Sequence, residues 1–114
     1  MPYSAGVFFL VMKLKPPKII RHLFPSLIWE IDDPEGVFLT FDDGPTPGIT
    51  EWILATLDKY DAKATFFVLG KNVEMYPDLY KRILDAGHKV GNHTYSHQKG
   101  WGMSLERYTE DVDF

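Results

Sequence analysis

The chain has 114 residues, of which 45% are hydrophobic, and a formal net charge of -4. This length allows at most one domain, and the hydrophobic content is typical of a packed core rather than of a disordered segment. A negative net charge without a basic cluster gives no reason to expect nucleic acid or an anionic membrane surface as a partner. Because cysteine is absent, any bound metal must be held by histidine and carboxylate side chains.

Residues 1–35 form the least regular part of the sequence, and we predict an irregular N-terminal extension followed by a domain at 36–114. Ile19–Phe24 predicts one or two helical turns that end before Pro25. The loose alternation in Ser26–Ile31 predicts either an edge strand or an extended cover over the core.

The apolar run Val7–Met12 is much shorter than the ~20 residues that cross a bilayer. Positive charges follow this run instead of preceding it, which is the reverse of a signal peptide. We therefore expect neither a membrane span nor a signal peptide. As written, the sequence leads us to expect a cytoplasmic location, and the compartment itself is unknown.

The first strand and helix are predicted between Gly36 and Asp61. A β-branched and aromatic run predicts a short buried strand over Gly36–Asp42, bounded by turn residues. Thr50 is the predicted N-cap of an amphipathic helix that ends near Asp61. Its apolar residues recur at helical spacing: Ile53, Leu57 and Tyr60.

Two further strands and two helices follow. Ala64–Leu69 is continuously apolar and predicts a strand that is buried on both faces. Pro77 opens a helix that stops at Gly87, Lys89–Asn92 is a short third strand, and Ser104 caps a last helix. This alternation of strand and helix predicts a parallel sheet with right-handed crossovers. In such sheets the chemistry gathers at the carboxyl ends of the strands.

Two polar motifs fall at those strand ends. The first is Thr40–Pro45, which contains the adjacent acids Asp42 and Asp43 and runs into a tight turn. The pleat breaks down at the end of a strand, so both carboxylates can reach one site. Alone, this motif would be a solvated Asp-Asp-Gly turn. The second motif, His93–His97, follows the third strand and changes that interpretation.

His93 and His97 are four residues apart and, with one aspartate, form a common first shell for a divalent metal. Residue 94 is threonine, which excludes the HExxH metallopeptidase motif. One aspartate binds the metal and its neighbour serves as the base. A non-haem iron site is an alternative, since two histidines and a carboxylate also suit Fe(II).

Thr40–Pro45 together with His93–His97 resembles the first two motifs of the polysaccharide deacetylases, the NodB-homology carbohydrate esterases of family 4. The resemblance covers about 37–101 and implies that Asp42 is the catalytic base. It also implies that Asp43, His93 and His97 bind Zn²⁺, with Co²⁺ or Ni²⁺ as possible substitutes. The implied reaction is hydrolysis of acetyl groups on a polysaccharide or oligosaccharide by metal-activated water.

The fold implied by this resemblance is an α/β fold, a partial (β/α) barrel of the NodB type. A full barrel needs ~250 residues, so we expect about three βα units of a truncated domain. The family's later motifs are absent, and His88 matches none of them, so we interpret it as a helix-end residue. Uncovered barrel edges would favour self-association. The resemblance also raises Met12 as an alternative start to Met1.

The missing motifs support a second hypothesis, a catalytically inactive metal- or carbohydrate-binding fragment.

Overall fold

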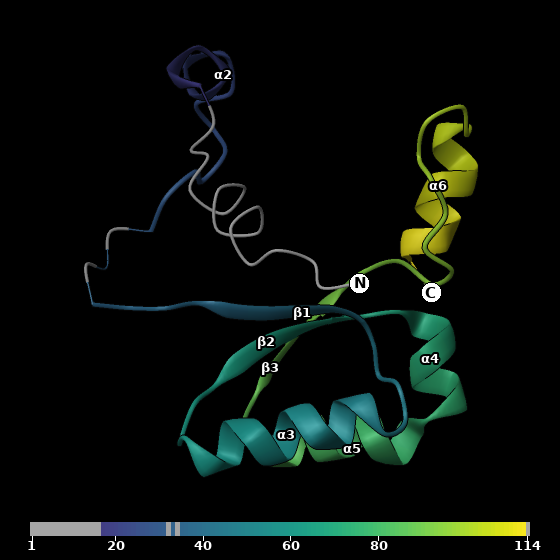
Figure 1. Ribbon diagram of the computed structural model, residues 1–114. Helices are drawn as coiled ribbons and strands as arrows, with labels where there is room; N and C mark the ends of the chain where they lie inside the picture. Colours follow the sequence, from purple (N-terminus) through teal and green to yellow (C-terminus); the bar gives the residue numbers. More distant parts are fainter. Residues whose placement is uncertain (1–16, 32, 34, 114) are drawn as a thin grey trace, which may run out of the picture. The chain divides into compact units, whose positions relative to one another are not determined.

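The computed structural model describes residues 17–31, 33 and 35–113 (Figure 1). The apolar run Val7–Met12 and the alternative start at Met12 lie outside the described residues. The chain divides after Gly36 into two units, which we describe separately. No helix within the described residues is both long enough and apolar enough to cross a bilayer.

In the N-terminal unit, α2 spans Lys18–Leu23, which confirms the predicted helical turns. The prediction of an edge strand at Ser26–Ile31 was wrong, because these residues form no strand. Within this segment, Glu30 forms an ion pair with Arg21 at 2.7 Å. This ion pair joins the segment to the helix that precedes it.

The second unit contains a three-stranded parallel sheet in the order β1-β2-β3. Its strands are β1 (Leu39–Gly44), β2 (Ala64–Val68) and β3 (Lys89–Asn92). Its helices are α3 (Ile49–Lys59), α4 (Gly70–Met75), α5 (Pro77–Asp85) and α6 (Leu105–Val112). The alternating order of strands and helices and the parallel pairing confirm the predicted α/β class. The start of α5 and the bounds of β3 also match the prediction.

The hydrophobic core lies between the sheet and α3 with α5, which run together along one face of the sheet (Figure 1). Its buried residues are Leu54, Leu57, Ala64, Phe66, Val68 and Ile83. The prediction that the central strand is buried on both faces was wrong, because Thr65 and Phe67 are only half-buried. Phe67 lies over Gly91, where an added Cβ would be 2.7 Å from the ring. Glycine therefore permits this close packing of β2 on β3.

The bounds of β1 differ from the prediction at both ends. Pairing with β2 begins at Leu39 and continues to Gly44, so both acids lie within the strand. Val37 is 82% exposed and precedes the first paired residue. The prediction of a buried strand was also wrong, because β1 is an edge strand that pairs only with β2 within the described sheet.

Thr50 is not the N-cap of α3, because the helix begins at Ile49 and Gly48 takes the capping position. Thr50 is buried, and its Oγ1 accepts a hydrogen bond from the Thr46 N–H at 2.8 Å. The hydroxyl thus closes the turn between β1 and α3. The same turn uses the left-handed φ of +80° at Gly48, a conformation that glycine adopts without steric cost.

His88 follows the end of α5, as predicted for a helix-end residue, and its side chain is buried. Its Nδ1 accepts a hydrogen bond from the Ala64 N–H at 3.3 Å, and its ring lies 5.4 Å from that of Phe66. Burial, with a smaller contribution from the charge on Lys63, lowers the pKa of His88. The imidazole therefore acts as a neutral part of the core.

Ser104 caps α6 as predicted, since its hydroxyl accepts a hydrogen bond from the Arg107 N–H. Helix α4 was not predicted. It begins at Gly70, which the sequence pattern indicated only as the end of a strand. This short helix becomes important because its first residues contact the loop after β3.

Candidate metal centre

A local irregularity of β1 positions Asp43. Asp42 and Gly44 pair with consecutive residues of β2, so Asp43 is an extra residue in the strand. Its backbone has a left-handed φ of +68°, and its carbonyl oxygen accepts a hydrogen bond from Asn72 Nδ2 at 2.7 Å. A bulge of this kind redirects the side chains beside it. It provides a physical basis for the predicted breakdown of the pleat at the strand end.

His93 and His97 lie on the loop that follows β3. Thr94 and His97 both have left-handed backbones, with φ of +67° and +59°. The Thr94 N–H donates to Asn92 Oδ1 at 2.7 Å, and Thr94 Oγ1 accepts from the His97 N–H at 3.0 Å. These hydrogen bonds close a tight turn. The two imidazole ring centroids are consequently only 5.0 Å apart.

The structure brings Asp43, His93 and His97 together. Asp43 Oδ1 lies 3.3 Å from His93 Nε2 and 3.4 Å from His97 Nε2. One ligand atom from each of the three residues lies within 4.8 Å of the others. The side chain of His93 is 31% exposed, whereas those of Asp43 and His97 are more than half exposed. The cluster is therefore open to solvent.

This donor set fits a divalent cation. Metal–ligand bonds of about 2.1 Å at tetrahedral angles place neighbouring ligand atoms about 3.4 Å apart, close to the separations of 3.3 and 3.4 Å found here. Two imidazole nitrogens and one carboxylate oxygen suit zinc and its neighbours in the first transition row. Three protein ligands also leave a position for water.

Asp42 lies one residue before the bulge and stands apart from the three-residue cluster. Its side chain is exposed, and its carboxylate forms no hydrogen bond or ion pair with any residue of the described parts. A carboxylate in this state can accept a proton without first breaking an interaction. The neighbouring acids thus have different environments, although they are adjacent in sequence.

Contacts from α4 and α6 that sequence reasoning missed hold the loop between the histidines. At the start of α4, the Gly70 N–H donates to Thr94 O at 3.1 Å and the Lys71 N–H to Tyr95 O at 3.2 Å. On the other side, Asp111 of α6 accepts hydrogen bonds from the loop. A single aspartate on a polar helix carries no sequence signal for this role.

Comparisons with known proteins identify the family. The family model for polysaccharide deacetylase matches residues 31–113. A peptidoglycan-N-acetylglucosamine deacetylase of Bacillus cereus is 56% identical over 76 residues, which are 67% of this chain and 28% of that protein. The chain therefore spans less than a third of that relative's length.

Solved structures of deacetylases and esterases are also similar to this chain. The peptidoglycan deacetylase PdaC of Bacillus subtilis matches with a TM-score of 0.67 and 43% identity, over 73% of this chain and 42% of that chain. A family 4 acetyl xylan esterase of Clostridium thermocellum, solved with a cobalt ion, matches with a TM-score of 0.62 and 36% identity, over 68% of this chain and 39% of that chain. With the family model covering most of the chain, the protein belongs to the polysaccharide deacetylase family.

Proposed function

We propose that this chain supplies the metal-binding and proton-accepting part of a site that hydrolyses acetyl groups on a polysaccharide or oligosaccharide. The convergence of Asp43, His93 and His97 is the observation that carries the proposal. Membership of the deacetylase family supports the reaction class. The names of similar proteins point to N-acetylated peptidoglycan sugars or acetylated xylan as substrate classes.

Asp43, His93 and His97 are the proposed ligands of a divalent cation, with Zn²⁺ as the first choice and Co²⁺ or Ni²⁺ as substitutes. When bound, such a cation lowers the pKa of water and polarises the acetyl carbonyl. Asp42 is the proposed general base, because its carboxylate is exposed and free of competing partners within the described residues. It accepts the proton that the attacking water loses.

Hydrolysis breaks the bond between the acetyl carbon and the sugar nitrogen or oxygen, and acetate is released. The leaving group must then receive a proton from a general acid. His88 is unsuited to that role, because it is buried and its Nδ1 accepts the Ala64 N–H. Its lowered pKa also favours the neutral imidazole.

The three-stranded sheet is also proposed to be part of a larger (β/α) barrel. Parallel strands with helices on one face support this architecture, as does the match to less than half of the PdaC structure. At the edge strand β1, an apolar pocket is lined by Phe41, Trp52, Ile53 and Tyr60 among others. An exposed apolar surface at a sheet edge favours association.

Acetate release from an N-acetylated chito-oligosaccharide tests the proposed reaction. The chain is assayed with Zn²⁺, with a chelator, and as the variant Asp42→Asn. Turnover that is lost with the chelator and in the variant supports the proposal. Metal binding without any acetate release would favour the alternative, an inactive metal-binding fragment. Turnover that persists in Asp42→Asn would contradict the assignment of the base.

A further inference from the structure

The C-terminal end of α6 contacts, through its backbone, the end of β3 and the loop that carries His93 and His97. The Tyr95 N–H donates to Asp111 O at 2.6 Å, and Asn92 Nδ2 donates to Val112 O at 2.8 Å. The last carbonyl groups of a helix have no partner within the helix. Here Tyr95 of the loop and Asn92 at the end of β3 supply donors for two of them, so the helix end is fixed to the start of the loop.

The side chain of Asp111 adds two further hydrogen bonds. Its Oδ1 accepts from Ser96 Oγ at 2.6 Å, and its Oδ2 accepts from the Ser96 N–H at 3.3 Å. The bond from the Ser96 hydroxyl is the main cause that lowers the pKa of Asp111. The carboxylate is therefore ionised, and hydrogen bonds to an ionised acceptor are stronger than neutral ones.

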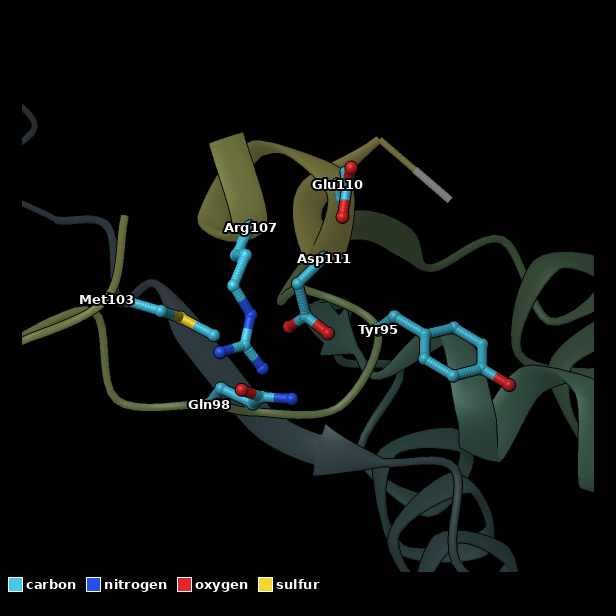
Figure 2. A pocket seen from close by; sticks show the side chains of 6 residues that line it. All are labelled: Tyr95, Gln98, Met103, Arg107, Glu110 and Asp111. Carbon is cyan, nitrogen blue, oxygen red and sulfur yellow. The ribbon is translucent and has the colours of Figure 1, made fainter. Parts of the chain in front are cut away.

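The close-up in Figure 2 shows the Asp111 carboxylate between the side chains of Arg107 and Tyr95. It extends from α6 toward the loop that carries Tyr95 and Gln98. These residues line an open pocket of about 350 Å³. The helix is thus joined to the loop at a defined point, next to solvent-filled space.

The segment that Asp111 holds has an unfavourable backbone. Thr94 and His97 are two of the four non-glycine residues with positive φ in the described parts of the chain. This conformation is unusual for a β-branched residue and persists only where the surroundings enforce it. Tyr95 and Ser96, which bond to Asp111, lie between these two residues.

Helices α4 and α6 bind opposite polar groups of this turn. The first N–H groups of α4 donate to the carbonyl oxygens of Thr94 and Tyr95. Asp111 accepts from the N–H groups of Tyr95 and Ser96 and from the Ser96 hydroxyl. The turn is thus held through its carbonyl groups by α4 and through its N–H and hydroxyl groups by Asp111.

We infer that Asp111 is a positioning residue for the metal centre, which fixes Ser96 and so holds His97 at ligating distance from Asp43. This inference rests on the proposed metal-binding role of Asp43, His93 and His97. Groups that orient metal ligands typically contribute 10- to 100-fold to metal affinity. Asp111 acts one residue away from the ligand, so its contribution is expected at the lower end of that range.

The test is a metal titration of the full chain, with Zn²⁺ followed by calorimetry and Co²⁺ by its visible absorption. The variants are Asp111→Asn, Ser96→Ala and their combination. Glu110→Gln is the matched control, because Glu110 is adjacent, exposed, and forms no hydrogen bond to the loop within the described residues. It removes the same charge from the same helix.

Each single variant should weaken Zn²⁺ binding about tenfold and alter the Co²⁺ absorption bands. The double variant should be little weaker than Asp111→Asn, because both changes act on the hydrogen bond from the Ser96 hydroxyl to the Asp111 side chain. Glu110→Gln should match the wild type. Amide exchange in the metal-free chain should increase at His97 in Asp111→Asn, with the amides of β2 still protected.

Wild-type affinity and Co²⁺ absorption in both Asp111→Asn and Ser96→Ala would overturn the inference, provided that His93→Ala loses binding. Loss of amide protection throughout the sheet in both variants would assign Asp111 a general role in stability instead. Failure of the wild type to bind Zn²⁺, or equal binding by His93→Ala, would contradict the proposed function and the inference with it. The metal affinity of the variants, the amide protection of the sheet and the metal binding of the wild type distinguish these three outcomes.

Discussion

The helix-covered face of the sheet and the loops at its carboxyl end are held by different interactions. On the helix-covered face, Ile83 is fully buried and Phe66 is 2% exposed, and apolar contacts dominate. At the carboxyl end, Asp43 and His97 are more than half exposed. Their positions depend on hydrogen bonds to backbone groups and on left-handed conformations.

This difference has a consequence for mutations. Apolar burial is non-directional and tolerates side chains of similar size, whereas a metal centre requires ligand atoms at fixed separations. Changes in the core should therefore alter the free energy of unfolding first. Changes in the loops should alter metal affinity while the fold persists.

The largest effect on stability is expected in the core. Phe66→Ala should lower the free energy of unfolding by about 3–5 kcal/mol, because it removes a buried ring and leaves a cavity. Phe66→Leu keeps most of the apolar volume and should cost about 1–2 kcal/mol. Urea denaturation measures both values. The exposed Trp52 is the control, and Trp52→Ala should stay within about 0.5 kcal/mol. Equal costs at the two positions would contradict the assignment of the core.

Variants at His88 test its hydrogen bond with the Ala64 N–H, a directional interaction beside the apolar core. His88→Ala should cost about 1–3 kcal/mol, because the buried Ala64 N–H loses its acceptor. His88→Asn should cost less, since its amide oxygen can occupy the position of Nδ1. Thermal or urea unfolding of the two variants makes the comparison. A greater loss in His88→Asn than in His88→Ala would mean that the hydrogen bond is unimportant.

The lowered pKa of His88 predicts that the free energy of unfolding depends on pH. The pKa of His88 is lowered from its usual 6.5, so the unfolded chain binds more protons than the folded chain between the two values. Its contribution to stability is therefore complete above about pH 6.5 and is lost as the pH falls through the lowered pKa. The stability difference between wild type and His88→Asn should shrink from about pH 8 to about pH 5.5. A difference that is constant with pH would contradict this prediction.

The smallest effect is expected at Asp61, which has a left-handed φ of +48° just after α3 and outside the metal centre. Asp61→Gly should stabilise the chain by about 0.5 kcal/mol, since glycine adopts this conformation freely but loses more entropy on folding. Metal affinity should be unchanged. A destabilised variant would show that the Asp61 side chain has a favourable role of its own.

Elements marked by local signals were predicted well. Pro77 begins α5 and Lys89–Asn92 forms β3 as expected. Proline at the start of a helix and glycine after its end mark these bounds through the local backbone conformation alone. The bounds of β1 were wrong, since they depend on pairing with a strand 25 residues away, at Leu39 and Ala64. Helix α4 was missed, because it begins directly after β2 at Gly70, which indicated only the end of a strand.

In the candidate site, too, features with a local sequence signal were predicted, and contacts between distant segments were not. The convergence of Asp43, His93 and His97 could be expected, because the carboxyl ends of parallel strands meet at one edge of a sheet. Asn72 and Asp111, which hold these loops through hydrogen bonds, could not be found. Their contacts join distant segments, and neither residue belongs to a motif. Their identification required the structure.

The decisive measurement compares the adjacent acids in a Zn²⁺ titration of wild type, Asp42→Asn and Asp43→Asn, with circular dichroism to confirm folding. If Asp43 is the ligand and Asp42 the base, wild type and Asp42→Asn bind one Zn²⁺ tightly, while Asp43→Asn binds far more weakly. Both variants remove one carboxylate charge from β1, so each is the other's control. Equal loss in both variants, or loss in Asp42→Asn alone, would contradict the division of roles between the two acids.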